Sequence, residues 1–537
     1  MKSDHSLSCY IIGNGFHAVK CGNILIEKKF KIEGVITSNL DIQKWACENN
    51  IPYIDPISNY YDVIKGKPFD YLFSINYLFL IPKEVLELPQ KMAINFHDSI
   101  LPSYAGIHAT SWAIINNEKQ HGITWHIMTD KVDEGEILKQ KIVNISETET
   151  AFTLNIKCFK ACVTAFEELL DELILGTYTK TQQNLINRSY YPKYKRPENG
   201  CIISWKSSAE SIYSLVRALN FGQHDNRVGV PLVYINSRYY IVTALRILEN
   251  SNQLPGTITK IEGNFIAIAT GTKDVAITKM FDFDGKIQDI NLIINELNLK
   301  VGSELLEIKP ELGKMITHYY NMLAKTEDYW VEKIAKQNPS ILPIMNYAEN
   351  RKFKDFEVIS RTITSELLGF KDNRNEDFTS YFEAQSTIFI LFIIYCFNIE
   401  HFCISIEHPE ISNKIIDIMG LFSTYVPFLI DLKGCEDNNK VIEIINSEFK
   451  NIKHNITFTR SIWHRYPILH QKAFKEKILP FPIHISCSKV NKCNIDGLIV
   501  CIPKDEKNIY FLFNSNVFEY DDIDNFINRY IDFADRN

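Results

Sequence analysis

The first hundred residues alternate between short apolar runs and stretches with helical spacing, and this alternation constrains the fold more than any other feature. After each run, apolar residues recur every three or four positions, which is typical of an amphipathic helix. Such alternation predicts a mostly parallel sheet with helices on both faces. The predicted strands are CYIIGNG (9–15), KIEGVIT (31–37), FDYLFSI (69–75) and KMAINFH (91–97).

The glycines after the first predicted strand do not form a dinucleotide fingerprint. Gly13, Gly15 and Gly22 depart from the G-x-G-x-x-G spacing, and no acidic residue cleanly ends the second strand. We interpret them as a tight turn from strand to helix.

Asn95 and His97 stand two positions apart at the end of the fourth predicted strand. Side chains alternate along a strand, so both point to one face, and parallel sheets bind ligands beyond their carboxyl ends. A later apolar run, GITWHIM (122–128), leads into a turn with Asp133 before Gly135. An amide, an imidazole and a carboxylate together suit acyl-type transfer onto an amine. Taken singly, His97 also fits a core histidine and Asp133 an ordinary turn residue.

The stretches NFHDSILPSYAG (95–106) and VDEGEIL (132–138) resemble the formyltransferases that use 10-formyltetrahydrofolate. The resemblance covers residues 1 to about 310, including QLPGTI (253–258) where the family has a Pro-Gly turn. It implies a catalytic Rossmann-like α/β domain (residues 1–190) and a small OB-like β-barrel (200–310). It also implies an enzyme whose catalytic residues are Asn95, His97 and Asp133, with 10-formyltetrahydrofolate as formyl donor and no metal.

The same resemblance implies which residues hold the folate. The pterin is expected against the backbone of two loops, with a third stretch as a further wall. Tyr77 and Phe79 fit ordinary core aromatics as well. The expected contacts are Tyr77, Leu78, Phe79, Ser99, Ile100, Leu101, Pro102, Thr129, Asp130, Lys131 and Val132.

The acceptor amine is less constrained. ATSWAI (109–114) and VRALNFGQHDNRVGVPL (216–232) resemble the formylation domains that start nonribosomal peptide synthetases. That subgroup implies an aminoacyl acceptor on a carrier protein, with a carrier protein and an adenylation protein or domain as partners. His108 stands where the subgroup has Asn, so it either touches the acceptor or only begins a helix. A free small amine, an amino sugar, methionyl-tRNA and a non-catalytic docking role remain alternatives.

Residues 315–537 form the third predicted domain. Stretches at 327–344 and 417–432, and the apolar stretch 378–397, resemble the second half of a condensation domain. No His-His-x-x-x-Asp motif occurs, so this α+β region is predicted to be non-catalytic and to dock partners. The alternative is an unrelated α/β packing domain.

Composition sets the outer bounds. A chain of 537 residues is too long for one core. A formal net charge of −7 argues against broad nucleic-acid binding. The longest apolar run (387–397) is too short to span a bilayer, and the start lacks a signal-peptide pattern. The twelve cysteines form no C-x-x-C pair. We therefore expect a cytoplasmic enzyme without membrane contact.

Overall fold

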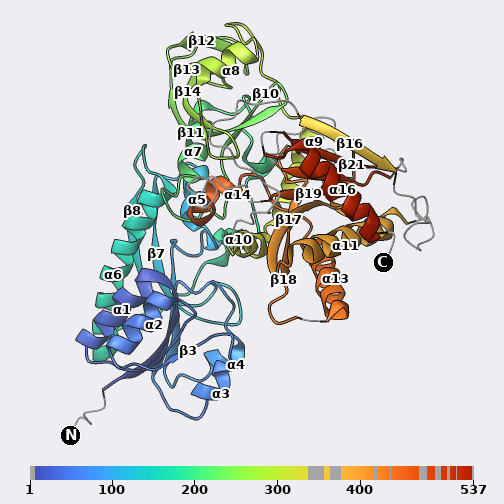
Figure 1. Ribbon diagram of the computed structural model, residues 1–537. Coiled ribbons are helices and arrows are strands. Elements are labelled where there is room, and N and C mark those ends of the chain that lie inside the picture. The colour runs from blue at the N-terminus through green and yellow to red at the C-terminus, as the bar shows by residue number, and fades with distance from the viewer. Residues whose placement is uncertain are drawn as a thin grey trace.

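The computed structural model shows three large sheets, one after another along the chain (Figure 1). A small two-stranded sheet pairs β6 (Ala105–Gly106) with β9 (Tyr190–Tyr191). It describes residues 6–336, 356–362, 377–415, 418, 420–435, 437–470, 481–489, 497–504, 508–515 and 517–534.

The first sheet has seven strands in the order β3-β2-β1-β4-β5-β7-β8. Pairing is parallel from β3 to β5 and antiparallel from β5 through β7 to β8. The predicted mostly parallel sheet is therefore confirmed. The strands are β1 (Ser8–Gly13), β2 (Lys31–Ile36), β3 (Tyr53–Ile54), β4 (Tyr71–Ile75), β5 (Met92–His97), β7 (Gln120–Ile127) and β8 (Ile137–Asn144).

Two apolar cores cover the two faces of this sheet. One packs against α1 (Gly15–Glu27), α2 (Leu40–Glu48), α5 (Ala109–Ile115) and α6 (Ala151–Leu175). The other packs against α3 (Tyr60–Ile64) and α4 (Lys83–Leu86). Within β5, Ile94 and Phe96 belong to the first core and Ala93 to the second. Asn95 and His97 share the face of Ala93 because side chains alternate along a strand.

The second sheet is antiparallel, with the order β10-β11-β14-β13-β12 and β15 paired to β14. Its two end strands, β10 and β12, are not neighbours in this order, and closure into an OB-like barrel remains a prediction. The elements are α7 (Ala209–Ala218), β10 (Leu232–Ile235), β11 (Arg238–Ile247), β12 (Ile258–Glu262), β13 (Phe265–Ala269), β14 (Asp274–Phe281), β15 (Ile287–Gln288) and α8 (Ile290–Glu296).

The third sheet is mixed, with the order β16-β21-β20-β19-β17-β18. Its central pairs β17–β19 and β19–β20 are parallel and the others antiparallel. The strands are β16 (Phe356–Thr362), β17 (His401–Glu407), β18 (Val426–Asp431), β19 (Ile483–Ser486), β20 (Leu498–Cys501) and β21 (Asn508–Asn514). This α+β arrangement leaves the condensation-like identity a prediction, and part of the stretches behind it (337–344, 417 and 419) lies outside the described residues.

The helices of the third region are α9 (Pro310–Leu323), α10 (Glu327–Ala335), α11 (Phe378–Phe397), α12 (Pro409–Ile415), α13 (Asn438–Asn455), α14 (Ile462–Arg465) and α16 (Tyr520–Ala534). Helix α11 is long and apolar enough to cross a membrane by length and composition alone, the only such helix among the described residues. Its Phe389 and Phe392 pack against Tyr530 of α16.

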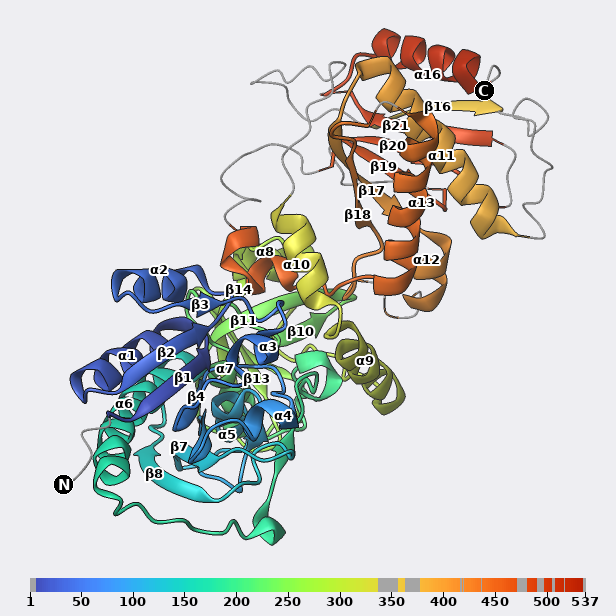
Figure 2. The ribbon, with the colours of Figure 1, turned by 90° about the horizontal axis from the view of Figure 1, so that it is seen from below.

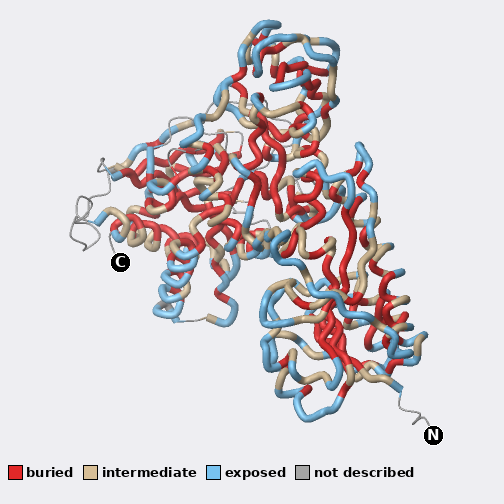
Figure 3. The backbone as a smooth tube through the Cα atoms, turned by 180° about the vertical axis from the view of Figure 1, so that it is seen from behind, coloured by how far each residue is buried: buried red, intermediate tan, exposed pale blue. Residues whose placement is uncertain are grey.

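The third region packs against the rest of the chain without a break. Helices α10 and α14 lie on the side of the third region that faces the first two domains (Figures 1 and 2). One core cluster joins Ile202, Leu232 and Phe283 to residues of the third region such as Tyr320 and Trp330. Figure 3 shows buried segments where the three parts meet. Residues on both sides of 310–315 therefore share one core, and the predicted domain boundaries stay a prediction.

Candidate active site

A cavity of about 1180 Å³ opens at the carboxyl ends of β4 and β5. Its lining includes Asn95, His97 and Asp133, together with His126 of β7. Because β5 ends the parallel part of the sheet, its last side chains reach the edge where such sheets bind ligands.

Asp133 lies between two histidines. Its carboxylate is 3.6 Å from His97 Nδ1 through Oδ2 and 3.5 Å from His126 Nε2 through Oδ1. The Asn95 side-chain nitrogen lies 3.2 Å from the same His126 Nε2. The structure thus brings the three predicted catalytic residues together, and their catalytic role stays a prediction.

Both ring nitrogens of His97 face acceptors. Nε2 lies 2.9 Å from the carbonyl oxygen of Tyr104, and Nδ1 faces the Asp133 carboxylate. A neutral imidazole carries one N–H, so it can satisfy only one of these acceptors. The His97 ring is 5% exposed, so its two nitrogens are shielded from water as well.

The Asp133 carboxylate is held in its charged form. Burial raises the pKa of Asp133, but the charge of His97, a hydrogen bond with His126 and the N–H of Gly106 outweigh it. The net result is a pKa well below the ordinary value for Asp. The Gly106 amide donates to Asp133 Oδ2 at 2.8 Å.

The turn that carries Asp133 depends on close backbone approach. Asp133 has φ of 54°, in the left-handed region that Asp and Asn enter more readily than most residues. At Gly135, a Cβ would lie 1.8 Å from the carbonyl oxygen of Ile127. Only glycine fits there, and Gln183 adds hydrogen bonds to the carbonyls of Asp133 and Gly135 at 2.9 and 2.7 Å.

His126 is a site residue that the sequence reasoning missed. It stands directly opposite Asn95 in the antiparallel pairing of β5 and β7. Its Nδ1 lies 2.9 Å from the carbonyl oxygen of Ile127, so Nδ1 donates there and Nε2 is left to accept from the Asn95 side-chain nitrogen, with the Asp133 carboxylate 3.5 Å away. The alternation of HGITWHIM was a usable signal, since it puts Thr124 and His126 on one face, but the pairing register was needed to bring that face to Asn95.

Two walls form the rest of the cavity. The loop wall comes from the segments after β4 and β7 and consists of Tyr77, Leu78, Phe79, Leu80, Ile81, Met128, Thr129, Asp130, Lys131 and Val132, with Lys83 and Lys193. The helix wall comes from the starts of α1, α5 and α6 and from the segment after α7, and consists of Phe16, His17, His108, Phe152, Asn155, Ile156, Cys158, Phe159, Phe221 and His224. Asn95 and His97 lie at the end of β5, between elements that cover opposite faces of the sheet.

The predicted folate contacts fall into two groups, those that line the cavity and those that do not. All the expected residues of the two loops line the loop wall. The stretch Ser99–Pro102 does not line the cavity, as far as the described residues show. Ser99 is fully buried and donates to the carbonyl of Ser103, and the Leu101 amide donates to Thr124. This stretch supports the site from behind, so the prediction of direct folate contact is not supported there.

The loop wall fits a folate. It offers exposed apolar surface on Leu78, Phe79 and Leu80 for flat rings. Lys83, Lys131 and Lys193 are the cationic side chains of the described lining, and Lys193 Nζ lies 5.0 Å above the Phe79 ring. Cations beside an apolar surface suit a molecule with aromatic rings at one end and carboxylates at the other.

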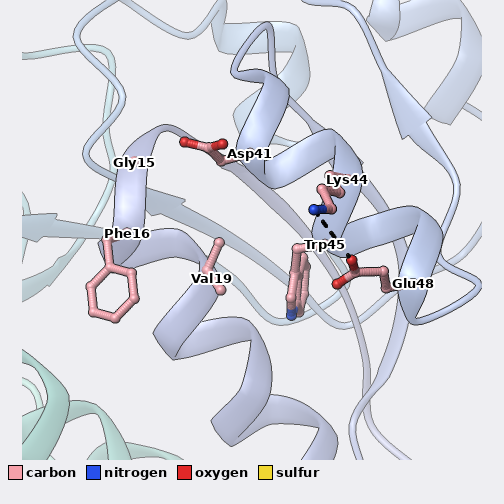
Figure 4. A pocket seen from close by; sticks show the side chains of 7 residues that line it. All are labelled: Gly15, Phe16, Val19, Asp41, Lys44, Trp45 and Glu48. Carbon is pink, nitrogen blue, oxygen red and sulfur yellow. Dashed lines mark ion pairs between the residues drawn. The ribbon is translucent and has the colours of Figure 1, made fainter.

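A smaller depression of about 330 Å³ lies between α1 and α2 (Figure 4). Its lining is Gly15, Phe16, Val19, Asp41, Lys44, Trp45 and Glu48. Lys44 and Glu48 form an ion pair of 4.0 Å, one helical turn apart. It contains no histidine or cysteine. Across the described residues, no group of three or more His, Cys, Asp or Glu is arranged to hold a metal ion.

Comparisons with known proteins agree with this geometry. Residues 58–169 match the formyl transferase family, and residues 196–298 match the C-terminal domain of formyl transferases. The methionyl-tRNA formyltransferase of Clostridium novyi (strain NT) is 28% identical over 297 residues, which are 51% of this chain and 92% of that protein. The bifunctional polymyxin resistance protein ArnA of Wigglesworthia glossinidia brevipalpis is 26% identical over 363 residues, 63% of this chain and 54% of that protein.

Among solved structures, an N-formyltransferase from Helicobacter canadensis in complex with folinic acid and dTDP-3-aminofucose is similar to this chain. It has a TM-score of 0.42 and 18% identity, and the match covers 52% of this chain and 100% of that one. The two family matches enclose the cavity-lining strand β5, the turn at Asp133 and the antiparallel sheet. In the part that holds this cavity, the chain therefore matches the formyltransferase family, and it is a formyl-transfer enzyme.

Proposed function

We propose that this protein transfers the formyl group of 10-formyltetrahydrofolate to the amine of an aminoacyl group held on a carrier protein. The observation that carries formyl transfer is the position of Asn95, His97 and Asp133 between the two walls of one cavity. The loop wall holds the folate, which supplies the formyl group, and the helix wall holds the acceptor.

The residues divide the work by their geometry. The Asn95 amide and the Nδ1 side of His97, whose contact with Asp133 is a long 3.6 Å, hold the formyl oxygen as it gains negative charge during attack by the amine. Asp133 presents a negative charge to His97, because its own pKa is held well below the usual value. A carboxylate with so low a pKa is a weak base, so the acceptor amine must arrive in its neutral form. After the attack, the bond between the formyl carbon and the folate N10 breaks, and the proton that the amine loses goes to N10, which leaves as tetrahydrofolate.

The helix wall favours an apolar acceptor. Its aromatic side chains form a cluster in which His17 lies 4.7 Å from the Phe159 ring and 5.8 Å from the Phe96 ring, between centroids. Burial lowers the pKa of His17, which keeps that ring neutral. The described lining of this wall has no lysine or arginine. It therefore suits an aminoacyl side chain better than a nucleotide diphosphate.

The synthetase-like stretch 216–232 supports the carrier-bound acceptor. Its Phe221 and His224 belong to the helix wall, so the residues that carry this resemblance lie where the acceptor would bind. One curated relative favours methionyl-tRNA as a second candidate acceptor, because that relative acts, by its name, on methionyl-tRNA. The chain's net charge of −7 argues against a long tRNA contact.

Mass spectrometry decides between these acceptors. The full chain is incubated with 10-formyltetrahydrofolate and, separately, with aminoacyl carrier proteins, methionyl-tRNA, amino sugars and free amino acids. We expect a gain of one formyl group on an aminoacyl carrier bearing an apolar residue. Formylation of methionyl-tRNA alone would replace the acceptor class, and no transfer to any amine would contradict the function.

A second measurement tests the carrier protein as a partner. The same aminoacyl group is offered on the carrier protein and on free pantetheine. If the carrier surface contacts the enzyme, KM is lower for the carrier-bound form while kcat is similar. Equal KM values would remove the carrier protein from the proposal.

A further inference from the structure

The segment after α7 is fixed by a buried ion pair that belongs entirely to the third region. Arg465 of α14 contacts Glu327 of α10 through both terminal guanidinium nitrogens, one at 2.9 Å. Both side chains are nearly inaccessible, at 2% and 8% exposed. Tyr466 adds a hydrogen bond from its hydroxyl to Glu327 at 2.5 Å.

This ion pair contacts the segment that supplies Phe221 and His224 to the helix wall. The same Arg465 guanidinium donates to the carbonyl oxygen of Asn226 at 2.8 Å, and the Asn226 amide donates back to the Arg465 carbonyl at 2.9 Å. These contacts join residues 239 positions apart in sequence. Asn226 lies two residues after His224, which lines the cavity.

Asn226 also braces its own segment. Its side-chain nitrogen donates to the carbonyls of Leu219 and Gly229 at 2.9 and 2.6 Å. Its side-chain oxygen accepts from the amides of Val228 and Gly229 at 3.0 and 3.2 Å. The whole segment 219–229 is therefore a loop tied at one central residue, and that residue is held by Arg465.

The charges of the third region also reach the cavity lining. Burial lowers the pKa of His108 to about 3, with Arg196 and Arg227 lowering it further and Glu327 opposing them. Arg227 in turn pairs with Asp328 of α10 at 2.6 Å. The segment that supplies Phe221 and His224 to the helix wall thus contacts α10 through the ion pair of Arg227 and Asp328.

We propose that Glu327 and Arg465 are positioning residues for the acceptor. Through them the third region sets the shape of the helix wall, because it holds the segment 219–229. The loop wall receives no contact from this pair, so folate binding is independent of it. The proposal rests on the assignment of the helix wall to the acceptor, as proposed above. It gives the third region a role in formyl transfer that requires no chemistry of its own.

The variant that tests it removes both charges together. Arg465→Met alone would leave Glu327 buried without a partner, which destabilises strongly, whereas removing both charges of a buried pair is often tolerated. The test variant is therefore E327Q/R465M in the full chain. Its matched control is K333M/E448Q, which removes another buried ion pair of the third region that does not touch residues 219–229.

Two readouts separate this proposal from the function it rests on. Hydrogen exchange measures the segment without any acceptor, and we expect the amides of 219–229 to exchange about tenfold faster or more in E327Q/R465M. The control should exchange as the wild type does. Unchanged exchange in a folded E327Q/R465M protein would overturn the proposal, whichever acceptor the enzyme uses.

Kinetics supply the second readout. The KM for the acceptor should rise about tenfold or more in E327Q/R465M, while the affinity for a folate analogue stays at the wild-type value. The conservative variant Arg465→Lys should recover part of the acceptor KM, since Lys can still donate to Asn226. Equal weakening of folate and acceptor would show a general structural role and contradict the proposal. Failure of the wild type to formylate any amine would contradict the function instead, and would leave the exchange result to decide the positioning.

Discussion

In two clusters of the described residues, buried histidine meets a carboxylate beside a sheet, and the two clusters differ in how fully their hydrogen bonds are made. In the first, Asp133 stands 3.5–3.6 Å from two histidines and beside a cavity. In the second, His408 follows β17 and its Nε2 lies 3.1 Å from Glu383, which also accepts from Lys453 at 2.9 Å.

Both ring nitrogens of His408 have hydrogen-bond partners. The amide of Glu410 donates to His408 Nδ1 at 3.3 Å, so Nε2 carries the proton that Glu383 accepts. The ring is fully buried, and it does not line either of the cavities described above. His97 instead faces two acceptors and a large cavity. We therefore expect the same residue types to serve catalysis where the contacts are long and open to a ligand, and packing where they are complete.

The largest expected difference between the clusters is in kcat. His97→Ala should lower kcat by about two to four orders of magnitude, because it removes a group that stabilises the developing charge. The matched change His408→Ala should leave kcat near the wild-type value and lower the melting temperature instead. Steady-state kinetics with circular dichroism as a folding check separates the two. A well-folded His97→Ala enzyme with normal kcat would show that the His97 cluster has no catalytic role that the His408 cluster lacks.

The lowered pKa of Asp133 should also make the free energy of unfolding depend on pH. Its pKa is lowered in the folded state, so its contribution to stability is present above the unfolded value and is lost as pH falls through the folded value. Since unfolded Asp has a pKa of about 4, the wild type should lose this stability only below that pH. Asp133→Asn removes it.

The measurement is urea unfolding across an acid pH series. The stability difference between wild type and Asp133→Asn should shrink steadily as pH falls below about 4. A difference that stays constant down to the lowest pH would show that the carboxylate is not held in its charged form. The variant should also have a strongly reduced kcat at neutral pH.

His126 should have a smaller effect than His97, because it acts through Asn95 and Asp133. His126→Phe removes the partner of the Asn95 nitrogen, and we expect kcat to fall by about 10- to 100-fold, as for the loss of one or two oriented hydrogen bonds. The affinity for a folate analogue serves as the control and should stay unchanged. An unaltered kcat would reduce His126 to a packing residue like His408.

The smallest expected effect on activity belongs to Glu407 in the third region. It accepts hydrogen bonds from three serines: Ser412 at 3.0 Å, Ser488 at 2.9 Å and Ser486. Glu407→Gln should lower the free energy of unfolding by about 1.5–3 kcal/mol, the usual loss for hydrogen bonds to a charged group. If kcat fell as well, the third region would hold chemistry that its closed contacts do not indicate.

Local patterns predicted the first sheet well. The predicted strand 31–37 and β2 (Lys31–Ile36), and 91–97 and β5 (Met92–His97), differ by one residue at an end. Parallel strands between helices are buried on both faces, and the sequence shows this directly as short apolar runs. The same pattern placed Asn95 and His97 at a strand end.

Long-range pairing explains what was missed. His126 needed the register of β5 against β7, and the Arg465–Asn226 contact joins positions 239 apart. Ser99 to Pro102 were placed by resemblance beside the folate, but Thr124 of β7 accepts the Leu101 amide and holds the stretch behind the site. Neither kind of contact leaves a periodic signal in the chain.

The antiparallel pairing of β5 with β7 has a consequence for judging whether a purified preparation is correctly folded. Asn95 meets His126 only in the observed register, in which Ile94 pairs with Ile127 and His97 with Thr124. A slip of one residue would turn His126 toward Phe166 and bring Trp125 to the cavity, since side chains alternate between the faces. Specific activity per folded molecule thus reports how faithfully this strand pair assembled, and a preparation with normal secondary structure but low specific activity would point to mispaired strands.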